Sequence, residues 1–229
     1  MTTITPTLNL THLFTSLPQK QWTLLRVLKS ANPHDINGNL HGTASFTPLD
    51  TTTTTTTTTA QPQSRPQRQL LYTETGTLPA HIGHNLQWKK SYIWRLSTPP
   101  TSAVKDDLSV WFVKVGDEKV ADYLFHGMEF HTDTSDTSTG GEGEGEEDDE
   151  YVSAPLPPAA GGETVVVTAR GNHLCINDMY RTAYAFRVLK GDGGGDGIGE
   201  VVSWASRHVV KGPKKDQDIV NYYTLRDAV

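Results

Sequence analysis

The sequence has few of the features that mark secreted or membrane proteins. Its 229 residues include one cysteine, Cys175, so no internal disulfide can form, which fits a reducing compartment. No apolar run approaches the roughly 18 residues that a membrane-spanning helix requires. The first 17 residues contain no lysine or arginine and therefore lack the features of a secretory or mitochondrial signal. These absences predict a cytoplasmic protein that does not bind membranes.

Positive charge is also scarce. The chain carries 20 Lys and Arg against 26 Asp and Glu, which gives a net charge of −6. Seven of the acidic residues form one run between positions 142 and 150, and the rest of the chain is close to neutral. Nucleic-acid-binding domains carry a basic surface for the phosphate backbone. We therefore expect no nucleic acid among the partners of this protein.

Large apolar residues are nearly absent from three stretches rather than scarce along the whole chain. Residues 50–69 include nine consecutive threonines, residues 132–163 are acidic and then rich in Pro and Ala, and residues 191–199 are mostly glycine. Such stretches bury too little apolar surface to offset the entropy that is lost on ordering. We predict three disordered loop insertions in a single domain that runs from residue 8 to residue 226.

The remaining sequence has the pattern of short strands. Eight to ten β-rich runs are separated by turn pairs such as Asn37-Gly38 and Gly116-Asp117. One helix is expected near residues 8–17. Because helices do not alternate with the strands, the chain is predicted to be all-β, either a sandwich or a closed antiparallel barrel.

Polar residues at inward-facing positions decide between these two architectures. Arg26 stands close to several leucines, Glu74 follows Tyr72 on the same strand face, and His126 follows Phe125. Such groups would be costly in the dry core of a sandwich, whereas a small barrel can hold a cavity in which they meet water or a ligand. We therefore predict a single antiparallel β-barrel with a short N-terminal helix.

Short blocks of residues along the chain resemble a known family. The blocks are His173-x-Cys175-x-x-Asp178-x-Tyr180, Gly212-Pro213-x-Lys215-Asp216, Tyr72-x-Glu74-x-Gly76, Tyr92-x-Trp94 and Phe125-His126. Through them the chain resembles the domain-of-unknown-function 6314 family of bacteria and fungi, over nearly all of its length outside the three insertions. The resemblance implies a compact lipocalin-like barrel and brings no assigned activity.

A weaker likeness at the chain ends is to lipocalins and related calycins. In those proteins a tryptophan that opens the first strand packs under a basic residue from the last strand. Trp22 and Arg226 would take these parts here. The glycine that usually stands two residues before the tryptophan is replaced by Lys20.

Four residues of the first block have side chains suited to catalysis. His173 and Cys175 share a strand face, and Asp178 and Tyr180 follow closely. In an enzyme, His173 would be the general base, Asp178 would orient it and Tyr180 would be the acid. In the alternative, Asp178 caps a turn and His173 is hydrogen-bonded within the fold. Zinc needs four ligands, and no second pair accompanies this one, so no metal site is predicted.

A second group of residues predicts a polar patch inside an aromatic pocket. Tyr72 and Glu74 share one strand face, and Tyr92 and Trp94 share another. Such a mixture is typical of a small-molecule pocket, and Arg26 on the first strand is positioned to pair with Glu74. In the alternative, Arg26 and Glu74 form a purely structural ion pair or point to solvent.

Two further features extend the predicted binding site. Lys214 and Lys215 follow a Gly-Pro turn and, at the rim of a barrel mouth, would attract an anionic ligand; in the alternative they belong to a tight turn only. His126 faces the same interior. If the ligand were a haem, His126 or His173 would bind its iron, but no cofactor is otherwise predicted.

The sequence thus favours a binding protein over an enzyme. No Gly-x-Ser-x-Gly, Walker, HExxH or CxxC motif is present. We expect the cavity to bind a small apolar or amphipathic molecule, oriented by Glu74, Tyr92, His126, His173 and Tyr180. A cofactor-independent isomerase or cyclase using His173, Asp178 and Tyr180 is the first alternative. A protein-interaction scaffold is the second, and the oligomeric state is left open.

Overall fold

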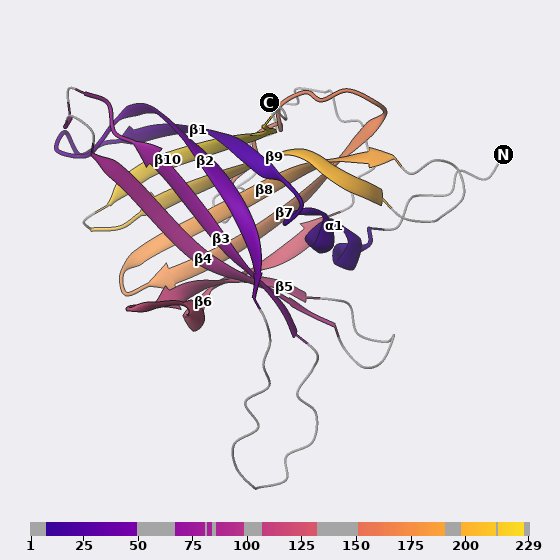
Figure 1. Ribbon diagram of the computed structural model, residues 1–229. Coiled ribbons are helices and arrows are strands. Elements are labelled where there is room, and N and C mark those ends of the chain that lie inside the picture. Colours follow the sequence, from indigo (N-terminus) through magenta and orange to yellow (C-terminus); the bar gives the residue numbers. More distant parts are fainter. Residues whose placement is uncertain are drawn as a thin grey trace, which may run out of the picture.

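The computed structural model describes residues 8–49, 67–80, 82–83, 86–98, 107–131, 151–190, 198–213 and 215–226. These residues form one short helix and ten strands (Figure 1). In chain order the elements are α1 (Leu10–Ser16), β1 (Gln21–Ser30), β2 (Gly38–Leu49), β3 (Gln67–Thr77), β4 (Gln87–Ser97), β5 (Asp107–Lys114), β6 (Asp117–His131), β7 (Thr164–Cys175), β8 (Asp178–Lys190), β9 (Ile198–Lys211) and β10 (Asp216–Leu225). Neighbouring strands are antiparallel, and β1 pairs with β10, so the sheet closes into a barrel. The predicted all-β barrel with a single short helix is confirmed.

Alternation of side chains along each strand separates the inside of the barrel from its outside. In β1, Trp22, Leu24 and Arg26 are buried, while Thr23 is exposed and Leu25 is half-buried. Successive side chains of a strand point to opposite faces of the sheet. One face of β1 therefore lines the barrel interior, and this face carries a buried arginine, as the sequence predicted.

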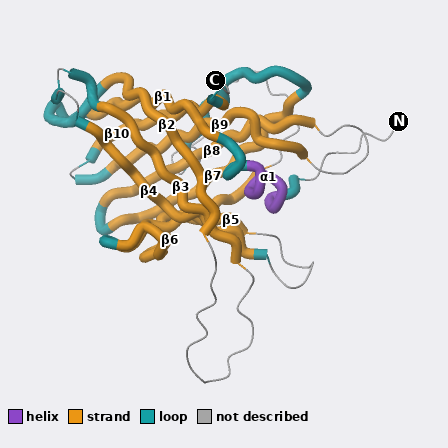
Figure 2. The backbone as a smooth tube through the Cα atoms, viewed as in Figure 1, coloured by secondary structure: helices purple, strands orange, loops and turns teal. Residues whose placement is uncertain are grey.

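The two ends of the barrel are built differently. At the hairpin end, on the left in Figure 1, short connections join β1 to β2, β3 to β4, β5 to β6, β7 to β8 and β9 to β10. Gly38 and Gly116 have φ values of 105° and 86° at this end, which glycine adopts without steric cost. At the other end, which we call the helix end, α1 lies beside the strands that lead into the longer connections (Figure 2).

Helix α1 closes the helix end. Asn9 caps it by accepting a hydrogen bond from the His12 backbone N–H at 3.0 Å. Leu13, Phe14 and Leu17 are at most 2% exposed and belong to the main hydrophobic core. The helix packs against β9, so its apolar face covers the interior that ten strands would otherwise leave open to water.

Aromatic rings fill the barrel next to this helix. Trp22 and Trp204 meet edge to face with 6.3 Å between ring centroids, Phe46 and Trp94 meet in the same way at 5.0 Å, and Phe186 stacks on Trp204 at 6.0 Å. Aromatic pairs in these geometries each add about 0.5–1.5 kcal/mol beyond the area that they bury. This half of the barrel is therefore a packed core.

The basic residue beside Trp22 is not the one expected from the lipocalin likeness. The Lys20 ammonium lies 5.9 Å from the centre of the Trp22 ring and donates a hydrogen bond to the Val201 carbonyl. Arg226 is exposed, and its backbone N–H donates to the Gln21 carbonyl at 2.9 Å. The cation that covers the tryptophan thus comes from the residue that replaces the usual glycine.

The predicted insertions reach further into the sequence than the structure supports. Gln67–Thr77 form β3 and Ile198–Lys211 form β9, so residues 67–69 and 198–199 are strand residues. Residues 151–163 lie against the outer face of β8 and β9, where Arg187 donates to the carbonyls of Pro157 and Pro158 and Ser203 donates to Pro158. The ends of the predicted insertions thus belong to strands or contact the barrel. Residues 50–66, 132–150 and 191–197 lie outside the described residues.

One seam of the barrel is only partly paired. β6 pairs with β7 through Glu129, Phe130 and His131 alone, although β6 spans Asp117–His131. The β5–β6 ladder also has register shifts. Towards the hairpin end, β6 therefore hydrogen-bonds to β5 on one edge and leaves Tyr123 and Leu124 about half exposed.

Candidate functional site

A cavity of about 290 Å³ occupies the half of the barrel near the hairpin end. Every strand except β2 and β7 contributes lining residues. The indoles of Trp94 and Trp204 belong both to its lining and to the aromatic core, so they form its floor. Lys215, in the β9–β10 connection, lines it at the opposite side. The cavity thus begins where the aromatic core ends.

A carboxylate lies at the centre of this cavity wall. Glu74 is buried, and its Oε1 accepts hydrogen bonds from the hydroxyls of Tyr72 at 2.5 Å and Tyr223 at 2.7 Å. Its Oε2 accepts one from the Arg26 guanidinium, with 2.5 Å between Nη2 and Oε2. The four side chains come from β1, β3 and β10. This confirms the contact between Arg26 and Glu74 that the strand pattern suggested.

The charges of this cluster stabilise one another. Burial by itself would raise the pKa of Glu74, but the charge of Arg26 and the two tyrosine hydrogen bonds outweigh it and lower that pKa. Burial and the nearby carboxylate raise the pKa of Tyr72 and of Tyr223 well above 10. At neutral pH, Glu74 is therefore ionised, Arg26 is charged and both tyrosines keep their protons.

The network continues across the barrel from Arg26. Its Nε donates to Asn221 Oδ1 at 2.7 Å, and Asn221 Nδ2 donates to Ser206 Oγ at 2.9 Å. His208 Nε2 lies 3.2 Å from the same Ser206 oxygen. Burial lowers the pKa of His208 well below 6.5, and the charges of Arg26 and Lys90 act in the same direction. The imidazole is therefore neutral, and this side of the cavity is polar without further charge.

Two glycines make room for an indole beside the charged cluster. Gly42 on β2 faces Gly76 on β3, which in turn faces Trp88 on β4. A Cβ atom on Gly76 would lie 2.6 Å from the Trp88 ring. With no side chains there, the ring packs flat and Arg26 lies 4.9 Å from its centre. The aromatic face adds to the interactions that hold the guanidinium in place.

The predicted catalytic residues lie at the hairpin end without forming the expected triad. The ring of His173 is 6.1 Å from that of Tyr180. Asp178 forms an ion pair with Lys215 at 3.4 Å, and Lys215 also donates to the Tyr180 hydroxyl at 2.6 Å. No hydrogen bond joins Asp178 to His173 among the residues that the structure describes. Asp178 therefore orients a lysine rather than the imidazole, which corrects its expected role.

A histidine and a tyrosine form a separate pair beside the cavity. His126 Nε2 lies 3.0 Å from the Tyr184 hydroxyl, and its Nδ1 lies 3.2 Å from the Gly127 carbonyl. Burial lowers the pKa of His126 to about 4, so the ring is neutral at physiological pH. Both of its nitrogens are occupied within the protein. Neither His126 nor His173 lines the cavity, so the structure gives no support to a haem ligand at either position.

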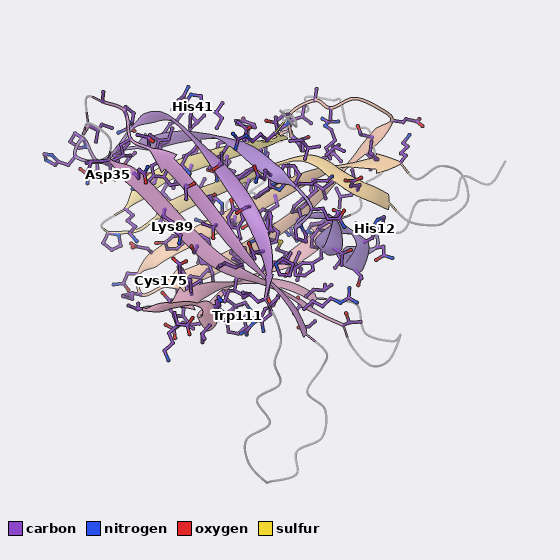
Figure 3. All side chains as sticks on the ribbon, in the orientation of Figure 1. His12, Asp35, His41, Lys89, Trp111 and Cys175 are labelled. Atoms are coloured by element: carbon purple, nitrogen blue, oxygen red, sulfur yellow. The ribbon has the colours of Figure 1, made fainter. Side chains whose placement is uncertain are left out.

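The predicted site residues thus divide into three groups. Those that line the cavity are Arg26, Tyr72, Glu74, Tyr92, Trp94 and Tyr180. Those outside its lining are His126, His173, Cys175 and Asp178; Figure 3 shows Cys175 near the β7–β8 hairpin. Lys214 lies outside the described residues, and its neighbour Lys215 lines the mouth.

The sequence-based selection missed many lining residues, and five with polar side chains matter most for the site. They are Lys90, Ser206, His208, Asn221 and Tyr223. Period-two spacing could have found three of them: Lys90 shares a strand face with Tyr92, and Ser206 and His208 share one with Trp204. No local pattern marks Asn221, because its role depends on the arginine of another strand.

Two kinds of site are not found in the described part of the chain. Those residues contain no group of three or more His, Cys, Asp or Glu side chains placed to hold a metal ion. They also contain no helix long and apolar enough to span a membrane.

Comparison with known proteins identifies a family. A family model described as "Family of unknown function (DUF6314)" matches residues 19–154 and 158–225. No curated protein matches the chain. No solved structure matches it either.

Proposed function

The chain belongs to DUF6314, a family of unknown function, and from the cavity itself we propose that this protein binds a small amphipathic molecule inside the barrel. The observation that carries the proposal is the arrangement of the lining. Aromatic rings form the floor, hydrogen-bonding groups line one wall, and charged side chains stand near the mouth. This combination of apolar body and few placed polar groups is typical of small-molecule sites.

The size of the cavity limits the ligand. Its volume of about 290 Å³ is close to the lower end of the range for ligand pockets, roughly 300–1,000 Å³. About ten water molecules, at roughly 30 Å³ each, would fill the same space. A compact ligand with one or two rings is therefore a better candidate than a long lipid.

The protonation states favour binding over acid–base catalysis. General acids and bases work best when their pKa lies near the operating pH. In this lining the pKa of Glu74 is lowered, those of Tyr72 and Tyr223 are raised, and that of His208 is lowered. Each group is thus held in one protonation state at neutral pH. Such a wall orients a ligand well and transfers protons poorly.

Intrinsic fluorescence provides a direct test. Trp94 and Trp204 line the cavity, so a bound aromatic molecule should quench tryptophan emission, and binding should raise Tm by mass action. A panel of one- and two-ring compounds is screened by both methods. Mass spectrometry of the purified protein under native conditions would reveal a ligand retained from the host.

A pair of variants shows whether binding occurs in the cavity. Ile219 lines the cavity, whereas Val220 is its neighbour on the outer face of β10. Ile219→Trp should abolish binding by filling the space, and Val220→Trp should leave it unchanged. If no compound binds wild-type protein, or if Ile219→Trp binds as well as wild type, the proposal is wrong.

A further inference from the structure

The carboxylate in the cavity is already occupied. Glu74 is the only carboxylate that lines it in the described part of the chain. Both of its oxygens are occupied, one by the Tyr72 and Tyr223 hydroxyls and the other by Arg26. A ligand that needed to pair a positive charge with Glu74 would have to displace one of these buried partners, which is costly.

Donors in the cavity remain unused. The Lys90 ammonium lines the cavity and forms no hydrogen bond or ion pair with any described residue. The Tyr92 hydroxyl lines the cavity as well and has no hydrogen-bond partner among those residues. Unpaired donors of this kind are satisfied by a ligand that accepts hydrogen bonds.

The charges of the lining also favour a ligand that accepts hydrogen bonds, because cations outnumber carboxylates there. Three cations, Arg26, Lys90 and Lys215, face the cavity against the one carboxylate of Glu74. Arg26 is neutralised by that carboxylate, and Lys215 is partly neutralised by Asp178 behind it. Lys90 forms no ion pair with a described residue; burial and the charge of Arg26 lower its pKa, against the opposing effect of the more distant Glu74 carboxylate.

We propose that the ligand is an organic anion, with a one- or two-ring body on the aromatic floor and an acid group bound by Lys90, with Lys215 as a second contact at the mouth. This inference rests on the proposed function and names the ligand class of the same cavity. Lys90 lies on the same face of β4 as Tyr92 and Trp94, so a ring against those two side chains places its acid group towards the lysine.

A matched pair of probes separates charge from shape. 2-Naphthoate and 2-naphthamide have the same two-ring body and nearly the same size, but only the first carries a negative charge. Binding of each to the full-length protein is measured by quenching of tryptophan fluorescence and by isothermal titration calorimetry. We expect 2-naphthoate to bind about tenfold more tightly, the range of one hydrogen-bonded charge pair.

The lysine pair on β4 provides the control. Lys90→Met should weaken 2-naphthoate binding about tenfold and leave 2-naphthamide binding unchanged. Lys89→Met alters the adjacent residue, whose side chain pairs with Glu118 on the outer surface (Figure 3), and should change neither affinity. Lys215→Met should have a smaller effect than Lys90→Met, because Lys215 already pairs with Asp178.

The outcomes distinguish a failure of this inference from a failure of the proposed function on which it rests. If 2-naphthamide binds as tightly as 2-naphthoate, or if Lys90→Met and Lys89→Met behave alike, the anionic ligand is ruled out while cavity binding stands. If neither probe binds and the wider panel also fails, the proposed function itself is contradicted. A fall in Tm for Lys90→Met comparable to that of a core variant would show that the lysine is structural.

Discussion

The two halves of the barrel contrast in what fills them. At the helix end, α1 and the rings of Trp22, Phe46 and Phe186 fill the interior, and these three rings are at most 3% exposed. At the hairpin end, the same ten strands enclose a cavity of about 290 Å³ with charged and hydroxyl groups on its wall. One sheet thus encloses a dry core at the helix end and a polar cavity at the hairpin end.

The contrast shows how a polar interior is made compatible with a stable fold. Unpaired buried polar groups cost free energy, whereas apolar packing supplies it. Apolar side chains pack closely at the helix end. At the hairpin end, Arg26 donates hydrogen bonds to both Glu74 and Asn221. We expect the first half to determine stability and the second to determine binding.

The largest effect is expected in the packed half. Trp22→Ala removes a fully buried ring in contact with Trp204 and should lower the free energy of unfolding by about 3–5 kcal/mol. Trp111→Ala is the control, because Trp111 is only half-buried and stacks with Arg95 on the outer surface. Urea denaturation monitored by circular dichroism measures both. Equal losses would show that the barrel has no distinct packed half.

A comparable effect in the cavity half would come only from breaking the charged cluster. Glu74→Gln leaves the buried Arg26 without a counter-charge and should cost about 3 kcal/mol, near the range for removing one partner of a buried pair. Glu118→Gln breaks the exposed pair with Lys89 and should cost less than about 1 kcal/mol. The same denaturation experiment applies. A loss for Glu74→Gln as small as that for Glu118→Gln would mean that the cluster does not stabilise the fold.

The neutral histidines predict a pH dependence on the cavity side. His126 has its pKa lowered from 6.5 to about 4, so between these values the unfolded chain binds a proton that the folded chain does not. Stability is therefore full above pH 6.5 and should fall by about 1.4 kcal/mol per pH unit for this residue as the pH drops towards 4. His208 contributes in the same direction.

A variant isolates this contribution. His126→Gln should make the dependence of unfolding free energy on pH less steep between pH 6.5 and 4, whatever its effect on stability at pH 7. His41→Gln changes an exposed side chain (Figure 3) and is the control substitution. An unchanged slope in His126→Gln would contradict a buried, neutral imidazole.

The smallest effect on stability is expected at the proposed binding residue. Lys90 has no ion pair or hydrogen bond in the described structure and is exposed to the cavity solvent, so Lys90→Met should change the free energy of unfolding by no more than about 0.5 kcal/mol. Thermal unfolding without ligand measures this. A clearly larger loss of unfolding free energy would show that Lys90 stabilises the fold. The two halves of the barrel would then not divide stability and binding between them.

The sequence by itself determined the strands and the part of the cavity wall that holds the charged cluster. Period-two alternation directs Arg26, Tyr72, Glu74, Tyr92 and Trp94 to the same interior, and the structure finds all five in the lining. This follows from strand geometry, because a side chain's face depends only on its position in its own strand. The resemblance to DUF6314 was readable for the same reason, since its blocks are local.

Only the tertiary structure decided which strands meet across the barrel. Asn221 joins Arg26 and Ser206 because β10 lies between β1 and β9, and no local pattern contains that order. His173 and Cys175 have the inward-facing spacing, yet no residue of their strand β7 lines the cavity. The Pro158 carbonyl likewise accepts hydrogen bonds from Arg187 and Ser203, which are far away in sequence. Such contacts depend on closure of the sheet, in which residues distant along the chain supply each other's hydrogen-bond partners.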